Sequence, residues 1–415
     1  MEEWKEYRLG DLINISSGFA YKGEFIGNGE NYLLGMGCVS FRDTFLVSGI
    51  RPYSGDAPDR YLAYSGDIVL ATRQQSDNLP ILGMPAIIPK KYDGHKMIVG
   101  ANLYKVQNNS DFSNEYIYWL MKSPAYVHHI KSCQTGTTVR MITKANIEDF
   151  TFLAPKKETR DKIAQFFWNI ENKIELNRRI NENLEQQAQA LFKSWFVDFE
   201  PFKDGKFVDS ELGMIPEGWK VGTIGDYSKI RSGFAFKSSW WTDKGVKIVK
   251  IKNISSYGNL DMNDCSYVSK ENTLKAKEFS LKPGDLLIAM TGATIGKFCI
   301  VPILKEEMYV NQRVGKFFLG EKPISKVPFI YGLLKSENII SQIINKGQGS
   351  AQPNISANDI ETISIILPTE DIISKYNELV SPYFSLLIKN LNECDYLAQL
   401  RDILLPKLMS GELQI

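Results

Sequence analysis

Outside two long helical stretches, the chain contains short apolar runs that follow glycine–aspartate pairs and indicate β-strands. DIVLAT begins at Asp67 and DLLIAM at Asp285, and each comes directly after a turn signal, as a buried strand does. A helix-like apolar pattern follows later in both places, EYIYWLMKS from Glu115 and FIYGLLKSENIISQII from Phe329. A last strand then ends at a proline. The pattern predicts two compact α+β domains.

The two predicted domains are internal copies of each other. Trp4 recurs 215 residues later as Trp219. The same offset, or one within a few residues of it, relates Gly10-Asp11 to Gly225-Asp226, the SGFA-x-K segments 17–22 and 232–237, Gly66-Asp67 to Gly284-Asp285, and Pro155 to Pro368. A repeat that holds over this distance predicts one architecture used twice, with insertions in its loops.

A long helical stretch follows each domain. Between Thr159 and Phe196 the apolar residues alternate steps of four and three, as in the a/d seam of a coiled coil, and Asn177 and Asn181 fill the two remaining seam positions. The apolar seam residues are Ile163, Phe167, Ile170, Ile174, Leu184, Ala188, Leu191 and Trp195. The matching seam of the second stretch is Tyr376, Val380, Tyr383, Leu387, Asn390, Cys394, Leu397, Arg401, Leu404 and Leu408. We expect the two helices to pair with each other; the alternative is that each packs on its own domain.

Pro382 interrupts the second seam, and it is expected to kink or delay that helix. Between the first helix and the second domain, a segment rich in Gly, Pro and Asp predicts an ordered linker. The expected layout is a first domain at 1–155, a helix at 156–200, a linker at 201–216, a second domain at 217–368 and a helix at 369–415.

Composition narrows the class of protein. The hydrophobic fraction of 43% and the charged fraction of 23% are those of a soluble globular chain. No apolar run approaches the roughly 20 residues of a membrane span, and the acidic, polar start is unlike a signal peptide. The 5 cysteines are scattered and never spaced as CxxC, which favours reduced thiols over disulfides or zinc. We therefore expect a cytoplasmic protein without a metal site.

Charge changes this picture only slightly. The net charge of +1 gives no sign of a nucleic-acid partner. Residues 217–370, however, carry 20 lysines and arginines against 15 acidic residues. A mildly basic second domain is compatible with phosphate contact.

The sequence lacks the motifs that common enzyme chemistries need. It contains no GxxxxGK[ST] phosphate loop, no dinucleotide fingerprint and no Gly-x-Ser-x-Gly elbow. The Asn-Pro-Pro-aromatic motif with which adenine methyltransferases hold the target amino group is also missing. The histidines are His95, His128 and His129, and neighbouring residues of a helix point to different faces, which does not suit a shared metal. A duplicated chain with an active site should show that site twice, so we predict no catalytic residue.

Polar, glycine-rich loops are the duplicated feature that suits contact with DNA. In the second copy MTGATIGK begins at Met290, NQRV at Asn311 and GQGSAQPNIS at Gly347. Glycines permit close approach, hydroxyl and ammonium groups can meet phosphates, and amide and guanidinium groups can read adenine and guanine. The candidate DNA-binding residues here are Thr291, Gly292, Thr294, Lys297, Asn311, Gln312, Arg313, Gln348, Ser350 and Gln352. Each loop taken alone is more typical of an ordinary surface turn, and only the presence of all three on one domain balances that interpretation with contact.

The first copy keeps the frame but changes the content of the loops. TRQQSDNLP follows the strand from Thr72, and TGTTVRMITK begins at Thr135. The candidate residues are Arg73, Gln74, Gln75, Thr137, Thr138, Arg140 and Lys144. Lys22 and Lys237 belong to the segment that both copies share, so a phosphate or structural role suits them better than base reading. A shared scaffold with unlike loops predicts two readers of two different short sequences.

Along nearly its whole length the chain resembles the specificity subunits of type I restriction-modification systems. The strings that carry the resemblance are QALFKSWFVDFEP (189–201), SELGMIPEGWK (210–220), GATIGK with the downstream IVP (292–297 and 300–302), NQRV (311–314) and LLPKLMSGEL (404–413). The first domain lacks the GATIGK string, so the family's residue roles can be assigned less directly to residues of this domain.

The resemblance implies a fold and a set of partners. The fold is α+β, with two target-recognition domains separated by two long helices that form an antiparallel coiled coil. The implied function is non-catalytic binding of double-stranded DNA at a bipartite, asymmetric site, with docking of two methylation subunits. A restriction subunit can join the same assembly. S-adenosylmethionine, ATP and Mg are expected on these partner subunits, and no cofactor is expected on this chain.

The helices also suit the implied function. A helix of ~38 residues is about 57 Å long, roughly one and a half turns of B-DNA. Phe166, Phe192 and Trp195 add more apolar surface than one seam is expected to bury, which favours docking of a partner.

Three other interpretations stay open at this point. The chain could be the specificity subunit of a type IIB system, in which the methylation partner also cuts DNA. Only the neighbouring genes distinguish this interpretation from a type I subunit. A self-contained DNA methyltransferase would bind S-adenosylmethionine. A purely structural scaffold would show no sequence-selective DNA binding.

Overall fold

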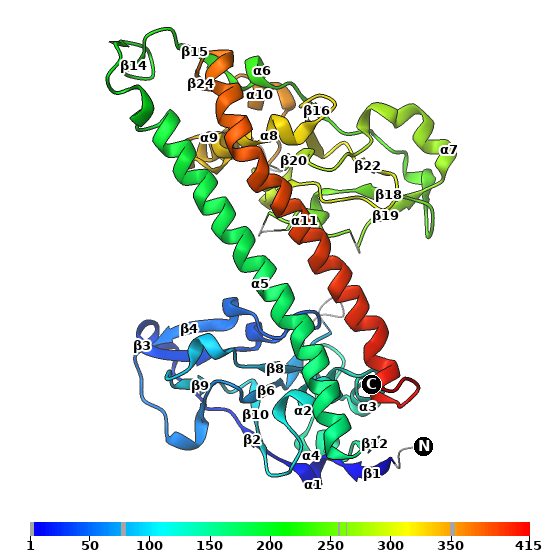
Figure 1. The fold of residues 1–415 in the computed structure, drawn as a ribbon. Helices are drawn as coiled ribbons and strands as arrows, with labels where there is room; N and C mark the ends of the chain where they lie inside the picture. The colour runs from blue at the N-terminus through cyan, green and yellow to red at the C-terminus, as the bar shows by residue number, and fades with distance from the viewer. Residues whose placement is uncertain (1–3, 76–79, 256–257, 263, 349–352) are drawn as a thin grey trace. The chain divides into compact units, whose positions relative to one another are not determined.

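The chain forms two compact units in the computed structural model, which describes residues 4–75, 80–255, 258–262, 264–348 and 353–415 (Figure 1). The first unit consists of Met1–Ile174 and Tyr396–Ile415, and the second of Glu175–Asp395. Each unit therefore contains one α+β domain together with the adjoining parts of both long helices.

Two four-stranded sheets form the first domain. One is antiparallel and has the order β2-β10-β6-β8; the other is mixed, with the order β4-β3-β9-β5 and a parallel pair between β3 and β9. Two short pairs, β1 with β12 and β7 with β11, complete the strands. The strands are β1 (Lys5–Arg8), β2 (Ile13–Ser17), β3 (Ile26–Leu34), β4 (Ile50–Tyr53), β5 (Leu62–Ala63), β6 (Ile68–Ala71), β7 (Arg73–Gln74), β8 (Pro85–Ile87), β9 (Met97–Val99), β10 (Leu103–Asn108), β11 (Arg140–Met141) and β12 (Thr151–Ala154). The helices are α1 (Leu9–Leu12), α2 (Asn114–Lys122), α3 (Pro124–Cys133) and α4 (Lys144–Glu148).

The second domain repeats this arrangement. Its sheets have the orders β16-β23-β20-β21 and β17-β19-β18-β22, again with one parallel pair in the mixed sheet, and β15 pairs with β24. The strands are β15 (Lys220–Thr223), β16 (Ile230–Ser232), β17 (Trp241–Thr242), β18 (Val246–Val249), β19 (Ser266–Val268), β20 (Leu286–Ala289), β21 (Phe298–Ile300), β22 (Met308–Val310), β23 (Val314–Phe317) and β24 (Ser364–Leu367). The helices are α6 (Ile224–Tyr227), α7 (Lys270–Thr273), α8 (Val327–Lys335), α9 (Glu337–Gly347) and α10 (Ala357–Glu361). The antiparallel sheets have equivalent strand orders, and in the mixed sheets β4-β3-β9 corresponds to β19-β18-β22, while the fourth strand lies at opposite edges. These correspondences confirm the internal duplication.

The glycine of the shared SGFA segment is required by a close contact between backbones. A Cβ atom on Gly18 would lie 2.1 Å from the carbonyl oxygen of Gly100, and one on Gly233 would lie 2.5 Å from that of Asn311. Any other residue at either position would push the two segments apart. The repeat of this segment in the sequence therefore has a structural cause.

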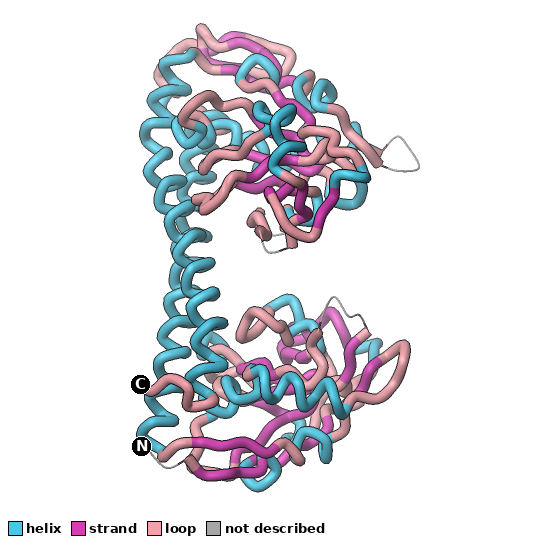
Figure 2. The backbone as a smooth tube through the Cα atoms, turned by 90° about the vertical axis from the view of Figure 1, so that its right-hand side faces the viewer, coloured by secondary structure: helices cyan, strands magenta, loops and turns pink. Residues whose placement is uncertain are grey.

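The two long helices are α5 (Lys157–Phe196) and α11 (Glu370–Met409), and a short hairpin of β13 (Phe207–Val208) and β14 (Ile215–Pro216) follows α5. Within each unit the two helices lie side by side and run antiparallel (Figures 1 and 2), joined by Glu171 and Arg401 in the first unit and by Asn181 and Asn390 in the second. The predicted seam residues Ile163, Phe167, Ile170, Ile174, Val380, Leu387 and Leu408 are buried, and Leu184, Leu191, Trp195, Leu397 and Leu404 are half-buried. The predicted antiparallel coiled coil is confirmed.

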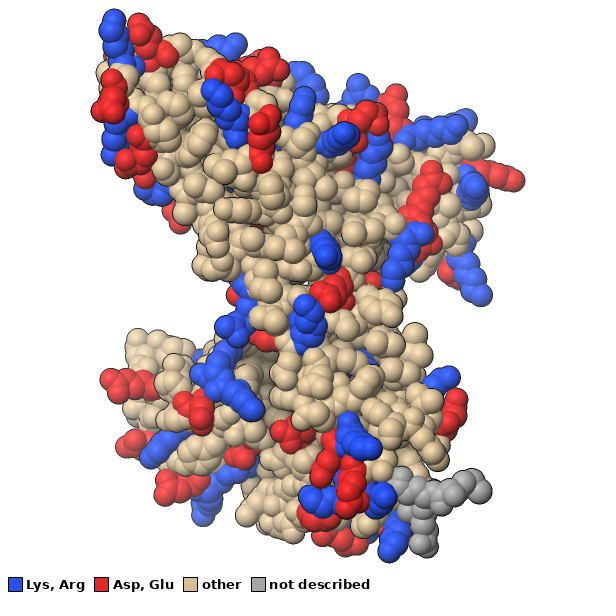
Figure 3. Space-filling view, viewed as in Figure 1, with Lys and Arg blue, Asp and Glu red and all other residues tan. Residues whose placement is uncertain are grey.

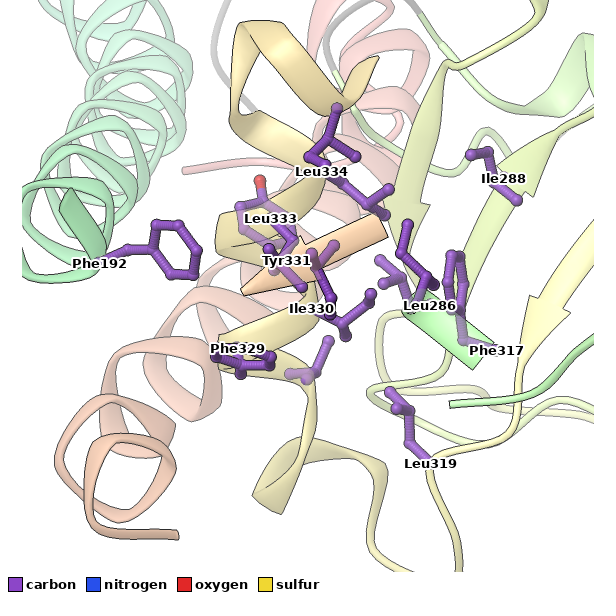
Figure 4. Packing of buried hydrophobic residues seen from close by; sticks show 14 of the residues in the cluster. Phe192, Leu286, Ile288, Phe317, Leu319, Phe329, Ile330, Tyr331, Leu333 and Leu334 are labelled. Carbon is purple, nitrogen blue, oxygen red and sulfur yellow. The ribbon is translucent and has the colours of Figure 1, made fainter. Parts of the chain in front are cut away.

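Both helices also pack on the second domain. They therefore pair with each other and, in addition, pack on a domain, which was the alternative expected from the sequence. Phe192 of α5 points toward α8 (Figure 4), where Gly332 has no side chain; a Cβ atom there would lie 2.2 Å from Cδ2 of Phe192. Phe192 is only 6% exposed, and Phe166 and Trp195 are half-buried. The expectation that these three aromatics are exposed is therefore wrong for Phe192, because the domain covers it.

Pro382 neither ends nor delays α11, so the delay expected from the sequence is wrong, while the kink stays a prediction. The helix begins at Glu370 and continues through the proline. Pro382 is exposed, so water can bond the carbonyl that loses its backbone donor. The adjoining Ser381 hydroxyl donates to the carbonyl oxygen of Asn377 at 2.5 Å, which ties this turn of the helix together.

Candidate nucleic-acid interface

Three predicted loops of the second domain meet at the end of strand β20. The residue after the strand is Met290, whose N–H donates to the carbonyl oxygen of Arg313 at 3.1 Å. Its own carbonyl oxygen accepts the N–H of Ile355 at 3.0 Å. The GATIGK, NQRV and PNIS segments are thus joined around one backbone position.

The side chains around this position form a polar surface. The hydroxyl of Thr291 donates to Oδ1 of Asn354 at 3.0 Å, and Nη1 of Arg313 lies 3.5 Å from the same hydroxyl. Gln312, Arg313 and Asn354 are exposed, and Thr291 is half-buried. We call Thr291, Gln312, Arg313 and Asn354 the second junction.

The GATIGK segment turns tightly beside the second junction. Its first residues form a short 3-10 helix, Gly292–Thr294, with Gly292 at a φ of 69°. The Thr294 hydroxyl donates to the carbonyl oxygen of Thr291 at 2.8 Å, so it serves the turn. Lys297 is half-buried behind it.

The first domain builds the same backbone frame with other side chains. The N–H of Thr72, the residue after β6, donates to the carbonyl oxygen of Asn102 at 3.2 Å, and the Thr72 carbonyl oxygen accepts the N–H of Ile142 at 3.3 Å. Arg73 pairs with Met141 in the β7–β11 ladder, as Thr291 pairs with Asn354 in an isolated bridge. We call Arg73, Ala101, Asn102 and Met141 the first junction.

Tyr104 connects the first junction to the late loop of its domain. Its hydroxyl donates to the carbonyl oxygen of Ile142 at 3.2 Å, and Nζ of Lys144 lies 5.8 Å from its ring centroid. Burial raises the pKa of Tyr104, against an opposing effect of Arg73, so the hydroxyl keeps its proton. Thr137 and Thr138 are exposed in this loop, and Arg140 is half-buried.

Two residues of the first junction, Ala101 and Asn102, were not among the residues predicted from the sequence. Ala101 and Asn102 occupy the places of Gln312 and Arg313, between strands β9 and β10 as those lie between β22 and β23. The signal was present in the sequence: VGANLYK at 99–105 matches VNQRVGK at 310–316, with a shared valine and a shared lysine. Only the strand pairing makes so short a match convincing.

Two of the predicted contact residues are buried, which argues against contact with a base. Gln74 is 7% exposed, and its Oε1 accepts the N–H of Leu82 at 3.2 Å, so it holds the following segment in place. Asn311 is 8% exposed at the crossing with Gly233. Gln75 and Gln348 are exposed. Ser350 and Gln352 lie outside the described residues.

Lys22 and Lys237 lie at exposed positions in the two domains. Nζ of Lys22 is 3.8 Å from Glu24, and Nζ of Lys237 is 5.4 Å from the ring centroid of Trp240. The SGFA segment reaches the second junction, because the carbonyl oxygen of Phe234 accepts the N–H of Gln312 at 3.1 Å. Both lysines remain candidates for phosphate contact.

A buried ion pair supports the sheet under the second junction. Nζ of Lys316 on β23 lies 2.6 Å from Asp285 and donates to the carbonyl oxygen of Ser280 at 2.6 Å. Burial raises the pKa of Asp285, although Lys316 acts in the opposite direction. The matching Lys105 of the first domain donates to the carbonyl oxygen of Leu62. Lys316 is buried and Lys105 is half-buried, and both donate to backbone carbonyl oxygens of their own domain.

Basic and acidic side chains are interspersed on the face drawn in Figure 3. Such a surface does not produce a broad positive field.

The one cysteine–histidine contact found among the described residues does not form a catalytic pair. Sγ of Cys133 lies 3.9 Å from Nε2 of His129, but this nitrogen is 2.7 Å from the carbonyl oxygen of Asn146 and must donate a proton to it. It cannot accept the thiol proton at the same time. Over the described ranges, no three His, Cys, Asp or Glu side chains gather as metal ligands would, and all five cysteines are free thiols. Nor does any described helix combine the length and the apolar character that a bilayer span requires.

Comparison with known proteins gives one consistent result. Residues 1–186 and 216–393 match the family described as the type I restriction modification DNA specificity domain. The specificity subunit of the type I restriction enzyme MjaIX of Methanocaldococcus jannaschii is 30% identical over 311 residues, which cover 73% of this chain and 69% of the relative. The specificity subunit of the HindI enzyme of Haemophilus influenzae is 24% identical, with 100% of both chains covered. The crystal structure of the type I S subunit from M. genitalium has the same fold, with a TM-score of 0.58 at 13% identity over 98% of this chain and 96% of that one.

Proposed function

Since this chain belongs to the family of type I restriction-modification specificity subunits, we propose that it selects the DNA target of such a complex. Each of its two domains reads one half of a bipartite, asymmetric site. The chain itself has no catalytic role, and partner subunits perform methylation and cleavage.

One observation carries this proposal: the same backbone frame presents different side chains in the two domains. The N–H and carbonyl groups of Thr72 and Met290 make equivalent hydrogen bonds. Around them, Arg73 and Asn102 stand where the second domain has Thr291 and Arg313. A duplicated catalytic site would keep its side chains, whereas two readers of different sequences must change them.

The chemistry of the junction side chains fits readout of base edges. A guanidinium can donate two hydrogen bonds to guanine O6 and N7, and a carboxamide can bond N6 and N7 of adenine. The first junction offers both groups in Arg73 and Asn102, and the second in Arg313 and Asn354. Lys22 and Lys237 then serve as phosphate contacts common to both halves.

Methylation subunits are the expected partners of the helices, two for each chain. Apolar side chains remain exposed on α5 and α11 in both units. They are Leu176, Leu379 and Leu386 in the second unit, and Tyr396 and Ile403 in the first, with exposed fractions between 41% and 60%. Exposed apolar side chains of this size on a helix pair suit packing against helices of another subunit.

The cofactors of the reaction belong to the partners in this proposal. S-adenosylmethionine is bound by the methylation subunit, and ATP and Mg by a restriction subunit, all in the cytoplasm. Calorimetric titration of the isolated chain with S-adenosylmethionine should give no heat of binding. A saturable heat would support a self-contained methyltransferase instead.

Selection from a randomised DNA library tests the proposal. The chain is co-expressed with its methylation subunit, the mass of the complex is measured, and bound DNA is sequenced. We expect two methylation subunits for each chain and a consensus of two unlike blocks separated by an unread spacer. A single block, or no consensus from an intact complex, would contradict the proposal.

A further inference from the structure

We propose that three positions of the shared frame set the base preference of each domain: 73, 102 and 141 in the first domain, and 291, 313 and 354 in the second. This inference rests on the proposed function and goes further, because it names the residues that make the two halves different.

Strand pairing establishes which positions correspond. Arg73 is paired with Met141 as Thr291 is paired with Asn354. The carbonyl oxygens of Asn102 and Arg313 accept the N–H of Thr72 and Met290, the residues directly after β6 and β20, at 3.2 and 3.1 Å. The three Cα positions are therefore fixed by backbone hydrogen bonds in both domains, whichever side chains they carry.

The side chains at these positions are accessible, unlike two other predicted residues of the same segments. Arg73, Met141, Arg313 and Asn354 are exposed, and Asn102 and Thr291 are half-buried. Gln74, next to Arg73, and Asn311, two residues before Arg313, are buried, whereas Gln312 is exposed beside Arg313. The burial of Gln74 and Asn311 limits the number of residues that can meet a base.

The two sets contain similar groups in different places. Each has one guanidinium and one carboxamide, but the guanidinium is at position 73 in the first domain and at 313 in the second. The carboxamide is at 102 in the first domain and at 354 in the second. On one frame, this exchange moves the guanine-reading group from the strand-pair position to the loop between strands. The two domains would therefore read guanine and adenine in different arrangements.

The residues that pack beside the three positions also differ between the two domains, while the backbone hydrogen bonds at these positions are kept. Tyr104 of β10 corresponds to Gly315 of β23, and Thr72 corresponds to Met290. A Cβ atom on Gly315 would lie 2.9 Å from Sδ of Met290. The second domain thus has a glycine beside Met290, whereas the first domain has Tyr104 and Thr72 at the same two positions, so the larger residue lies on a different segment in each domain.

Transplanting the three side chains tests the inference. The variant Arg73→Thr, Asn102→Arg, Met141→Asn carries the second set on the first domain. The complex with the methylation subunit is used to select DNA from a library randomised in both halves. We expect the first-half consensus to change at about one to three base pairs, with each relative preference shifted by roughly 5- to 150-fold. The second-half consensus should stay as it is.

Arg51→Thr is the matched control, because it makes the same chemical change at an exposed position of β4 in the same domain. It should leave both halves unchanged. The reciprocal variant Thr291→Arg, Arg313→Asn, Asn354→Met should change only the second half, and it tests the same inference if the first variant does not assemble.

The outcomes separate this inference from the proposed function. An unchanged first half in the variant would overturn the inference, and so would loss of all first-half preference in a complex that still selects the second half. If the unsubstituted complex selects no bipartite consensus, the proposed function itself fails.

Discussion

Nδ2 of Asn390 donates a hydrogen bond to Oδ1 of Asn181 at 2.9 Å, inside the helix seam of the second unit. Asn181 in turn donates to the carbonyl oxygen of Leu387 at 3.2 Å. A buried amide pair of this kind is satisfied in only one register of the two helices. It selects that register over others that would bury a similar apolar area.

A double-mutant cycle on this pair tests the assignment. Asn390→Leu leaves the buried oxygen of Asn181 without its donor, which should lower the free energy of unfolding by about 1–3 kcal/mol. The double variant Asn181→Leu, Asn390→Leu should recover most of that loss, because both polar groups are removed. Denaturant unfolding followed by circular dichroism gives the values. Losses that simply add would show that the two residues act independently.

The ion pair between Lys316 and Asp285 gives a prediction with a pH dependence. Lys316→Met leaves a buried carboxylate without its cation and should destabilise the domain by about 3–5 kcal/mol at neutral pH. The pKa of Asp285 is already raised above its ordinary 3.8 by burial, and loss of Lys316 removes a group that lowers it. A group with a raised folded-state pKa favours the folded state when protonated.

The penalty of Lys316→Met should therefore shrink as the pH falls toward the folded-state pKa of Asp285, and grow as the pH rises. Lys252→Met is the control: it removes a lysine whose partner Asp264 is exposed, and should cost at most about 1 kcal/mol at any pH. Thermal melts from neutral pH down to about pH 4, near the ordinary carboxyl pKa, decide the matter. A penalty for Lys316→Met that does not depend on pH would contradict this account.

Arg313→Ala separates base reading from phosphate contact. If its guanidinium meets a guanine, discrimination at that base pair should fall by about 1–3 kcal/mol while binding elsewhere is kept. Arg231→Ala, which removes an exposed arginine paired with Glu278, should leave discrimination unchanged. Competition binding with single-base variants of the site measures both. An equal loss of affinity for all sequences would assign Arg313 to the backbone of DNA.

The helix pair can be lengthened to test whether it sets the spacing of the half-sites. One heptad inserted after Asn181 adds about 10 Å to α5 and keeps the seam facing its partner. Because Asn181 contacts Leu387 and Asn390, the matching insertion in α11 belongs after Ser385. The preferred spacer should lengthen by up to roughly three base pairs. A selected consensus with the old spacer would show that the partner subunits set the distance.

The sequence predicted the frame of this molecule better than its surface. The sequence patterns predicted the repeat, two of its strands and the helix seam. The strands DIVLAT and DLLIAM are β6 and β20 in the structure, and the a/d seam lies on α5 and α11. Pro382 shows the limit of such rules, because its exposed position leaves the helix intact. The burial of Phe192 depends on Gly332, 140 positions further along the chain, and local pattern cannot reveal such a contact.

The candidate site shows the same division. The three polar loops of the second domain were predicted as candidate contacts, and the structure brings them together around Met290. Which side chain of each loop faces outward depends on strand pairing. For this reason the sequence could not show that the candidates Gln74 and Asn311 are buried, or that Asn102 occupies the position of Arg313.

Exchange of one domain tests the central claim most directly, namely that each domain reads its own half of the target. Residues 217–370 are replaced by the equivalent segment of a relative, and the host methylome is sequenced with the methylation subunit present. The account predicts a methylated motif whose second block is that of the relative, while the first block and the spacer are unchanged. A motif changed in both blocks, or in neither, would contradict the account.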